Sequence, residues 1–194
     1  LDNVDVVKLL SRVIMDLAEG EIKQNLNRYD SGQTFSKYIN KSYCKTASLI
    51  ANSAKAAGVL SDISTEKLEM LYEFGKNIGL AFQVVDDILD FTGNDKQLGK
   101  PAVSDLASGY LTAPVLYALE ENKNLSVLIE RELSEKDDLN NALEIIMNSG
   151  AIKKSRLLAE DFASHSKDAI LWLPESEYKR ALMALPEFVL SRLY

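Results

Sequence analysis

The sequence predicts an all-α fold. Apolar residues recur at helical spacing along almost the whole chain of 194 residues, and no alternating run or Asn-Gly turn indicates a β-hairpin. With 46% hydrophobic residues, the chain can bury a substantial core. We therefore expect a single helical domain over residues 1–194, built around one long central helix.

Apolar stripes in the first half of the chain predict three long helices, at residues 4–26, 34–57 and 65–91. Ser64 is a typical N-cap, and Glu66 places an acid in the first turn of the third helix. That helix would be about 40 Å long, which suits the centre of a large helical domain. Gly75 and Gly79, four residues apart, would let another helix pack closely against it.

The second half predicts shorter helices. Residues 102–110 are expected to form a loop, and Pro114 stands in the first turn of a new helix, where proline is tolerated. Further helices are expected at residues 125–133, 138–149, 151–171 and 177–192. Pro186 should kink or interrupt the last of them.

An acidic face marks the end of the third helix. Four polar residues share this face at about 100° per residue: Gln83, Asp86, Asp87 and Asp90. Three carboxylates within five residues repel one another unless a cation compensates them, and oxygen ligands suit Mg²⁺. Such acids also occur on solvated faces, but the apolar flanks LAFQVV and ILDFTG favour a metal site. Lys100 follows a short loop and could bind phosphate beside the metal.

Other polar residues leave two interpretations open. Lys45 lies in a run of small and apolar residues, where a lysine either snorkels outward or meets an anion. Glu21 and Gln24 lie one turn apart, and these residues alone favour a solvated helix face.

Composition excludes several classes of function. The net charge of −7 leaves no basic stripe for a nucleic acid. The single Cys44 excludes an intramolecular disulfide, and one cysteine with one histidine lacks the parts of a zinc site or a Cys–His nucleophile. No apolar run is long enough to span a bilayer, and no signal peptide opens the chain. We expect a soluble intracellular protein, cytoplasmic by default.

Five motifs occur in order: Lys45-Thr46-Ala47-Ser48; Gly79-x-x-Phe82-Gln83-x-x-Asp86-Asp87-x-x-Asp90; Gly99-Lys100; Asp105-Leu106; and Gly109 with Thr112-x-Pro114. The set resembles the trans-isoprenyl diphosphate synthases, and its spelling is most similar to the long-chain, solanesyl-type branch. The resemblance covers essentially the whole chain but only the C-terminal part of the family's domain. It implies an isoprenoid-synthase-type helical bundle around a central cavity, here lacking the N-terminal helices.

The resemblance also implies roles for individual residues. Asp86, Asp87 and Asp90 resemble the second aspartate-rich motif, with Asp86 the direct Mg²⁺ ligand and the others acting partly through water. Lys45 and Lys100 resemble the lysines that hold the diphosphate of the allylic substrate.

Four more positions match polar or wall residues of the family's cavity. Thr46 and Gln83 would stand beside the nascent allylic cation, so that Lys45, Thr46 and Gln83 form the implied catalytic group. Phe82 resembles a wall of the isopentenyl diphosphate pocket, and Gln24 a cavity glutamine.

The implied activity is transfer of isopentenyl diphosphate units to an allylic diphosphate, by a homodimer that makes a long prenyl chain for a quinone. The first aspartate-rich motif should lie upstream of Leu1, so we expect this chain to be inactive alone. A plastid or mitochondrial location is possible if an upstream transit peptide was removed. Tyr110 stands where many short-chain relatives have a diphosphate-contacting lysine.

Two alternatives remain. A non-catalytic regulatory subunit of a heteromeric synthase would explain the missing upstream motifs, but such subunits usually have decayed aspartates and this chain keeps all three. A class I terpene cyclase also uses an acidic helix and Mg²⁺. We find no second motif of its kind, Asn/Asp-x-x-Ser/Thr-x-x-x-Glu, after the acidic helix.

Overall fold

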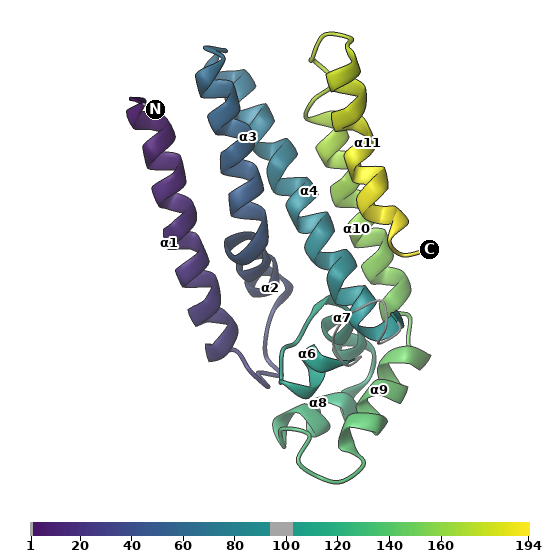
Figure 1. Ribbon diagram of the computed structural model, residues 1–194. Helices are drawn as coiled ribbons and strands as arrows, with labels where there is room; N and C mark the ends of the chain where they lie inside the picture. The colour runs from purple at the N-terminus through teal and green to yellow at the C-terminus, as the bar shows by residue number, and fades with distance from the viewer. Residues whose placement is uncertain (1, 94–102) are drawn as a thin grey trace.

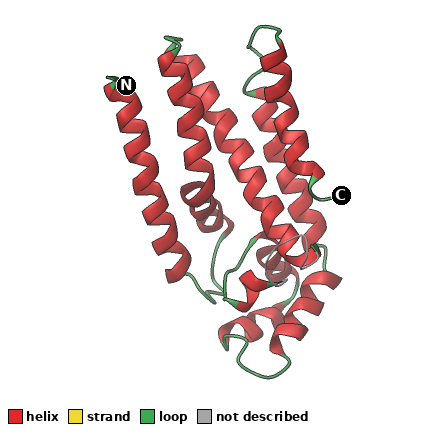
Figure 2. Cartoon of the chain, in the orientation of Figure 1, coloured by secondary structure: helices red, strands yellow, loops and turns green. Residues whose placement is uncertain are grey.

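The computed structural model describes residues 2–93 and 103–194, in which all regular structure is helical and no strand occurs (Figure 2). The elements are α1 (Val4–Leu26), α2 (Phe35–Ser42), the π-helix η1 (Tyr43–Ala47), α3 (Ser48–Leu60), α4 (Thr65–Thr92), α6 (Ser104–Ala107), α7 (Ala113–Glu121), α8 (Lys123–Glu130), α9 (Asp138–Asn148), α10 (Ala151–Asp168) and α11 (Glu177–Ser191). The all-α prediction is confirmed. None of the described helices combines the length and the apolar character needed to cross a bilayer.

The predicted long central helix is α4, which has 28 residues. It packs against α3 on one side and against α10 and α11 on the other, while α1 lies beyond α3 (Figure 1). Its second half is almost entirely enclosed: Val84, Val85 and Ile88 are fully buried. The acidic residues of the sequence motif therefore lie on a helix that the rest of the fold surrounds.

Local signals explain where the helices begin. The side chain of Asn3 accepts hydrogen bonds from the backbone N–H groups of residues 5 and 6, which caps α1. Thr34 and Ser176 cap α2 and α11 in the same way. Pro114 lies in the first turn of α7, as predicted.

The second predicted helix is not a single α-helix. Residues 35–60 are continuously helical, but η1 interrupts the α-helical pattern at Tyr43–Ala47. Two glycines let neighbouring helices approach this segment closely. A Cβ atom on Gly20 of α1 would lie 3.0 Å from the backbone N of Lys45, and one on Gly79 of α4 would lie 2.6 Å from the Cα atom of Ala47. The predicted close packing at Gly79 is therefore present, and η1 is the segment that fills it.

Several predicted boundaries are wrong. The second predicted helix runs to Leu60 rather than to residue 57, and α8 begins at Lys123 rather than at residue 125. The expected loop at residues 102–110 contains a one-turn helix, α6, which follows Val103 with its positive φ of 60°. α8 ends at Glu130 because Glu132 and Leu133 adopt left-handed backbone angles. α10 ends at Asp168 rather than at residue 171.

Pro186 does not interrupt α11, which continues to Ser191. The ring of Pro186 is buried, and Val189 one turn later belongs to the hydrophobic core. Burial of these side chains offsets the one backbone hydrogen bond that proline removes.

The apolar stripe of α1 is divided between two faces. Val6 and Val13 are buried, whereas Val7, Leu10 and Ile14 are exposed to 53%, 47% and 70%. The fold thus leaves a row of apolar side chains on the outside of α1.

Candidate functional site

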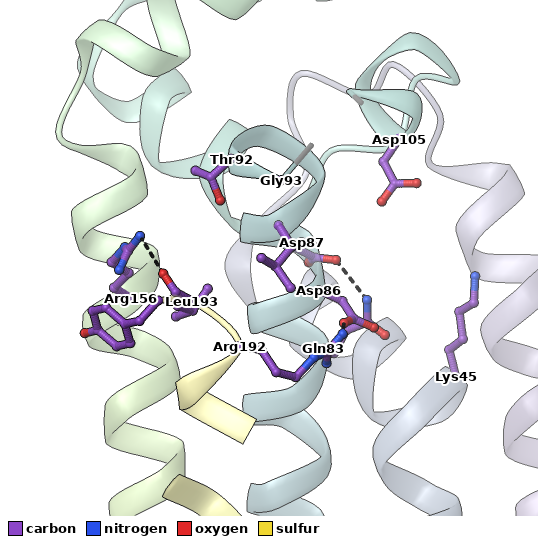
Figure 3. A pocket seen from close by; sticks show the side chains of 12 residues that line it. Lys45, Gln83, Asp86, Asp87, Thr92, Gly93, Asp105, Arg156, Arg192 and Leu193 are labelled. Atoms are coloured by element: carbon purple, nitrogen blue, oxygen red, sulfur yellow. Dashed lines mark hydrogen bonds and ion pairs between the residues drawn. The ribbon is translucent and has the colours of Figure 1, made fainter. Parts of the chain in front are cut away.

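A cavity of about 850 Å³ lies between η1, the C-terminal half of α4, the start of α6, the N-terminal part of α10 and the residues that follow α11 (Figure 3). Its polar lining includes Lys45, Gln83, Asp86, Asp87, Asp105, Arg156 and Arg192. The structure therefore brings the acidic face of α4 and the lysine of η1 to one cavity.

Asp86 lines this cavity with a partly exposed side chain. Its side chain is 39% exposed, and Oδ1 lies 2.7 Å from a guanidinium nitrogen of Arg192, which follows α11. A carboxylate at the surface of a cavity is accessible to a metal ion and to water.

Asp87 lines the cavity from a buried position, with 2% of the residue exposed. The hydroxyl of Tyr38 donates to its Oδ2 at 2.6 Å, and Nε2 of Gln83 donates to its Oδ1 at 2.8 Å. Burial raises the pKa of Asp87 to about 6, and the charge of Lys41 and the two hydrogen bonds oppose this rise. Burial likewise raises the pKa of Tyr38 well above its usual value.

Asp90 has a different environment from the other two aspartates. It is fully buried, and its carboxylate accepts hydrogen bonds from the hydroxyl of Ser104 and from the backbone N–H of Asp105, both at 3.1 Å. Its backbone carbonyl also accepts a hydrogen bond from Val103. The structure does not bring Asp90 to the cavity lining; Asp90 holds the start of α6, and with it Asp105, against α4.

η1 presents two adjacent side chains to two different helices. Nζ of Lys45 donates to Oε1 of Gln24 at 2.7 Å and lies 3.6 Å from a carboxylate oxygen of Glu21, both on α1. The hydroxyl of Thr46 donates to Oε1 of Gln83 on α4 at 2.6 Å. Of the two interpretations of Lys45, the structure supports the second in a partial form, because the amino group meets an acid at the edge of the cavity. π-Helical turns are often found at functional sites.

Thr46, Gln83 and Asp87 form a directed chain of hydrogen bonds. Thr46 donates to the amide oxygen of Gln83, and the amide nitrogen of Gln83 donates to Asp87. Each donor orients the next group, so the Gln83 side chain is held in one rotamer. Gln24 and Lys45 also line a smaller recess of about 50 Å³ beside this chain.

Phe82 is half-buried, and the guanidinium of Arg192 lies 4.7 Å from the centre of its ring. Lys100, the second predicted phosphate-binding lysine, lies outside the described residues. Tyr110 lines the small recess, and the guanidinium of Arg28 lies 5.7 Å from its ring.

Asp105 stood in one of the quoted motifs without an assigned role. Sequence reasoning missed four other residues at the site: Tyr38, Lys41, Arg156 and Arg192. Lys41 precedes Lys45 by one helical turn, and that spacing was a usable signal. It lines the small recess with Asp87, and burial lowers its pKa while the charges of Asp87 and Asp105 oppose this shift. The other three residues are far from the motif in sequence or carry no local pattern.

The carboxylate oxygens of the three aspartates are the candidate ligands for a metal ion. Within the described residues, the three aspartates do not converge on a single point. Asp86 and Asp87 nevertheless offer oxygen ligands at the cavity, and such ligands fit a hard ion such as Mg²⁺, which keeps several waters and shares substrate phosphates.

The structure resembles solved prenyl synthases. A heptaprenyl diphosphate synthase from Staphylococcus aureus superposes with a TM-score of 0.92 at 32% identity, over 98% of this chain and 61% of that one. A polyprenyl synthase from Caulobacter crescentus, complexed with calcium and isoprenyl diphosphate, superposes with a TM-score of 0.89 at 32% identity, over 98% of this chain and 60% of that one. The predicted isoprenoid-synthase-type bundle is confirmed.

Comparison of the sequence with known proteins also finds prenyl transferases and prenyl diphosphate synthases. A prenyl transferase from Synechocystis sp. is 53% identical over 194 residues, which cover 100% of this chain and 60% of the relative. A chloroplastic solanesyl-diphosphate synthase from Oryza sativa is 45% identical over 193 residues, which cover 100% of this chain and 48% of the relative. The chain thus spans 60% or less of the length of these relatives.

The sequence model of the family described as Polyprenyl synthetase matches residues 1–146, three quarters of the chain. The motifs quoted above, from Lys45 to Pro114, all lie within this match. Family model, relatives and solved structures agree, and the chain belongs to the polyprenyl synthetase family.

Proposed function

We propose that this chain is the C-terminal part of a trans-prenyltransferase that adds isopentenyl diphosphate units to an allylic diphosphate and makes a long prenyl chain. The observation that carries the proposal is one cavity lined by Asp86 and Asp87 on α4 and by Lys45 on η1. Anionic and cationic groups on facing walls suit a substrate whose diphosphate binds both a metal ion and a lysine.

Lys45 and the acidic pair bind the headgroup in this proposal. Asp86 would bind Mg²⁺ directly, and Asp87 would offer a second carboxylate from the cavity wall. Asp90 would support both indirectly, by holding the start of α6 against α4. A bound Mg²⁺ would neutralise the charge that develops on the leaving diphosphate. Lys45 turns its amino group from Gln24 to the phosphate oxygens, a movement that its partial exposure of 37% allows. Lys100 remains a proposed second phosphate ligand.

Thr46 and Gln83 act on the carbon chain. Because the Thr46 hydroxyl donates its proton to Gln83, its oxygen presents only lone pairs in the other directions. Lone pairs held in place by hydrogen bonds stabilise positive charge without reorganising, which is what an allylic cation requires. Phe82 stays the proposed wall of the isopentenyl diphosphate pocket, and Gln24 orients Lys45 before the substrate binds.

We propose that the complete protein works as a homodimer. Support comes from the apolar row on the outside of α1, since Val7, Leu10 and Ile14 are each about half exposed or more. Exposed apolar rows of this kind are typical of surfaces that another chain or segment covers. A single Ile14→Glu substitution should convert a dimer to a monomer in light scattering if α1 forms the interface, and an unchanged mass would contradict this assignment.

The test of the proposed activity uses the complete protein with farnesyl or geranylgeranyl diphosphate, labelled isopentenyl diphosphate and Mg²⁺. Asp86→Asn should lower turnover by roughly a hundredfold or more, the usual loss when a group that stabilises transition-state charge is removed. Asp161→Asn on the exposed face of α10 is the matched control and should retain wild-type turnover. Wild-type turnover in Asp86→Asn would refute the role of this carboxylate.

The same assay distinguishes a synthase from the alternative, a non-catalytic regulatory subunit. A folded complete protein that shows no turnover alone, but changes the product length of a catalytic partner, would favour that alternative over a synthase.

A further inference from the structure

The end of α11 brings a positive charge to the acidic face of α4. Arg192 is the C-cap residue of α11, and its guanidinium contacts Asp86 at 2.7 Å, as Figure 3 shows. The two residues are more than 100 positions apart in the sequence, so only the tertiary fold joins them. The partly exposed carboxylate of Asp86 therefore already has a cation beside it.

Further contacts position this arginine. Its guanidinium lies over the ring of Phe82, one turn before Asp86 on α4, at 4.7 Å from the ring centre. The next residue is also held: Arg156 of α10 donates to the carbonyl of Leu193 at 3.5 Å and lies 5.4 Å from the ring centre of Tyr194. The last residues of the chain are thus anchored on α4 and α10, with Arg192 directed at Asp86.

A guanidinium and a divalent ion have conflicting demands on one carboxylate. An ion bound to Asp86 would lie within about 5 Å of the guanidinium, given the usual Mg²⁺–oxygen distance of about 2 Å. Repulsion between a double and a single positive charge at that distance exceeds the attraction in a partly exposed ion pair. Arg192 and the metal cannot both be held at Asp86 at full strength.

We propose that Arg192 is a resident counter-cation of Asp86 and that a divalent metal displaces it. The inference rests on the proposed metal-binding role of Asp86. When no metal is bound, Arg192 relieves the repulsion between Asp86 and Asp87. Because the two cations compete for Asp86, Arg192 lowers the affinity for the metal, and the metal weakens the Arg192–Asp86 ion pair by the same factor. Arg192 is a positioning residue: it acts on the metal through Asp86.

The experiment measures binding of Mn²⁺ alone to the complete protein, by the paramagnetic resonance signal of the free ion. Arg192→Gln should tighten Mn²⁺ binding about two- to fivefold, the range that partly exposed ion pairs allow. Arg192→Lys keeps the charge and should show less than half of this gain. Lys167→Gln removes an equal charge and an ion pair between α10 and α11 away from the cavity, and should bind Mn²⁺ as the wild type does.

Equal Mn²⁺ affinity in wild type and Arg192→Gln would overturn the inference. Failure of the underlying metal role has a different signature, because Asp86→Asn would then bind Mn²⁺ as tightly as the wild type.

Thermal unfolding without metal gives an independent readout. The losses caused by Arg192→Gln and Asp86→Asn should be less than additive in the double variant, and strict additivity would show that the two side chains do not interact.

Discussion

The substitution Gly79→Ala tests whether the close approach of α4 to η1 positions the groups of the site. A Cβ atom at residue 79 would lie 2.6 Å from the Cα atom and 2.8 Å from the Cβ atom of Ala47, which is fully buried. Ordinary contacts of a Cβ atom begin at 3.4 Å, so the two segments must separate by about 0.8 Å. Neither atom of Ala47 belongs to a flexible side chain that could rotate away.

The expected loss of stability follows from two opposing effects. Overpacking in a close contact costs about 1–3 kcal/mol, and alanine in place of glycine in a helix returns about 1 kcal/mol. A net loss of up to about 2 kcal/mol corresponds to a decrease in Tm of up to about 8 °C for a chain of this size. The same displacement would lengthen the hydrogen bond from Thr46 to Gln83 from 2.6 Å to about 3.4 Å, which is outside the normal range.

The assay compares thermal unfolding, followed by far-ultraviolet circular dichroism, with turnover in the complete protein. Gly150→Ala is the control, since a Cβ atom there meets only the carboxylate end of the Glu121 side chain, at 3.2 Å. We expect Gly79→Ala to lose both stability and turnover and Gly150→Ala to retain both. A Gly79→Ala variant as stable and as active as the wild type would refute the claim that this contact sets the geometry of η1.

Three further predictions concern the buried Asp87. Its raised pKa of about 6 means that ionisation destabilises the folded state as the pH rises from about 4 to 6, by up to about 3 kcal/mol. Asp87→Asn should therefore lack this decrease in stability in metal-free thermal unfolding. An unchanged pH profile in the variant would contradict the assignment. Tyr38→Phe removes the donor to the carboxylate and should lower the free energy of unfolding at pH 7 by about 1–3 kcal/mol, with a smaller loss at pH 4 where Asp87 is protonated; equal losses in urea unfolding at both pH values would argue against it. Lys41→Gln removes a positive charge that lowers the pKa of Asp87, so carboxyl carbon NMR should show Asp87 titrating at higher pH in the variant, and a downward shift would disprove the coupling.

The long helices were predictable because their apolar residues recur at an uninterrupted helical period. The predicted ends of α1 and α4 agree with the structure to within one residue, and a typical N-cap precedes α4. η1 was not predictable in this way. Its residues are equally compatible with an α-helix, and the wider turn depends on how α1 and α4 pack against it.

The site shows the same division between local and tertiary information. Gln83, Asp86 and Asp87 are neighbours on one helix, so their spacing alone placed them together. The helical period also placed Asp90 on that face, but residues 103–105 fold back over it, which no local pattern indicates. Arg192 reaches Asp86 only through the packing of α11 on α4. Contacts between distant segments were therefore the part that the sequence could not supply without the structure.

The π-helical turn η1 makes the orientation of its side chains separable from the packing of the helices on either side of it. A π-turn contains one residue more than an α-turn, so the fold could absorb a one-residue deletion within Tyr43–Ala47 by straightening into a continuous α-helix. The flanking segments α2 and α3 would then keep their packing, while Lys45 and Thr46 would lose their separate orientations toward α1 and α4. Such a shortened chain would fold and yet lack the arrangement of Lys45 and Thr46 on which the proposed function depends, which makes this turn a natural place to lose the proposed activity without a loss of structure.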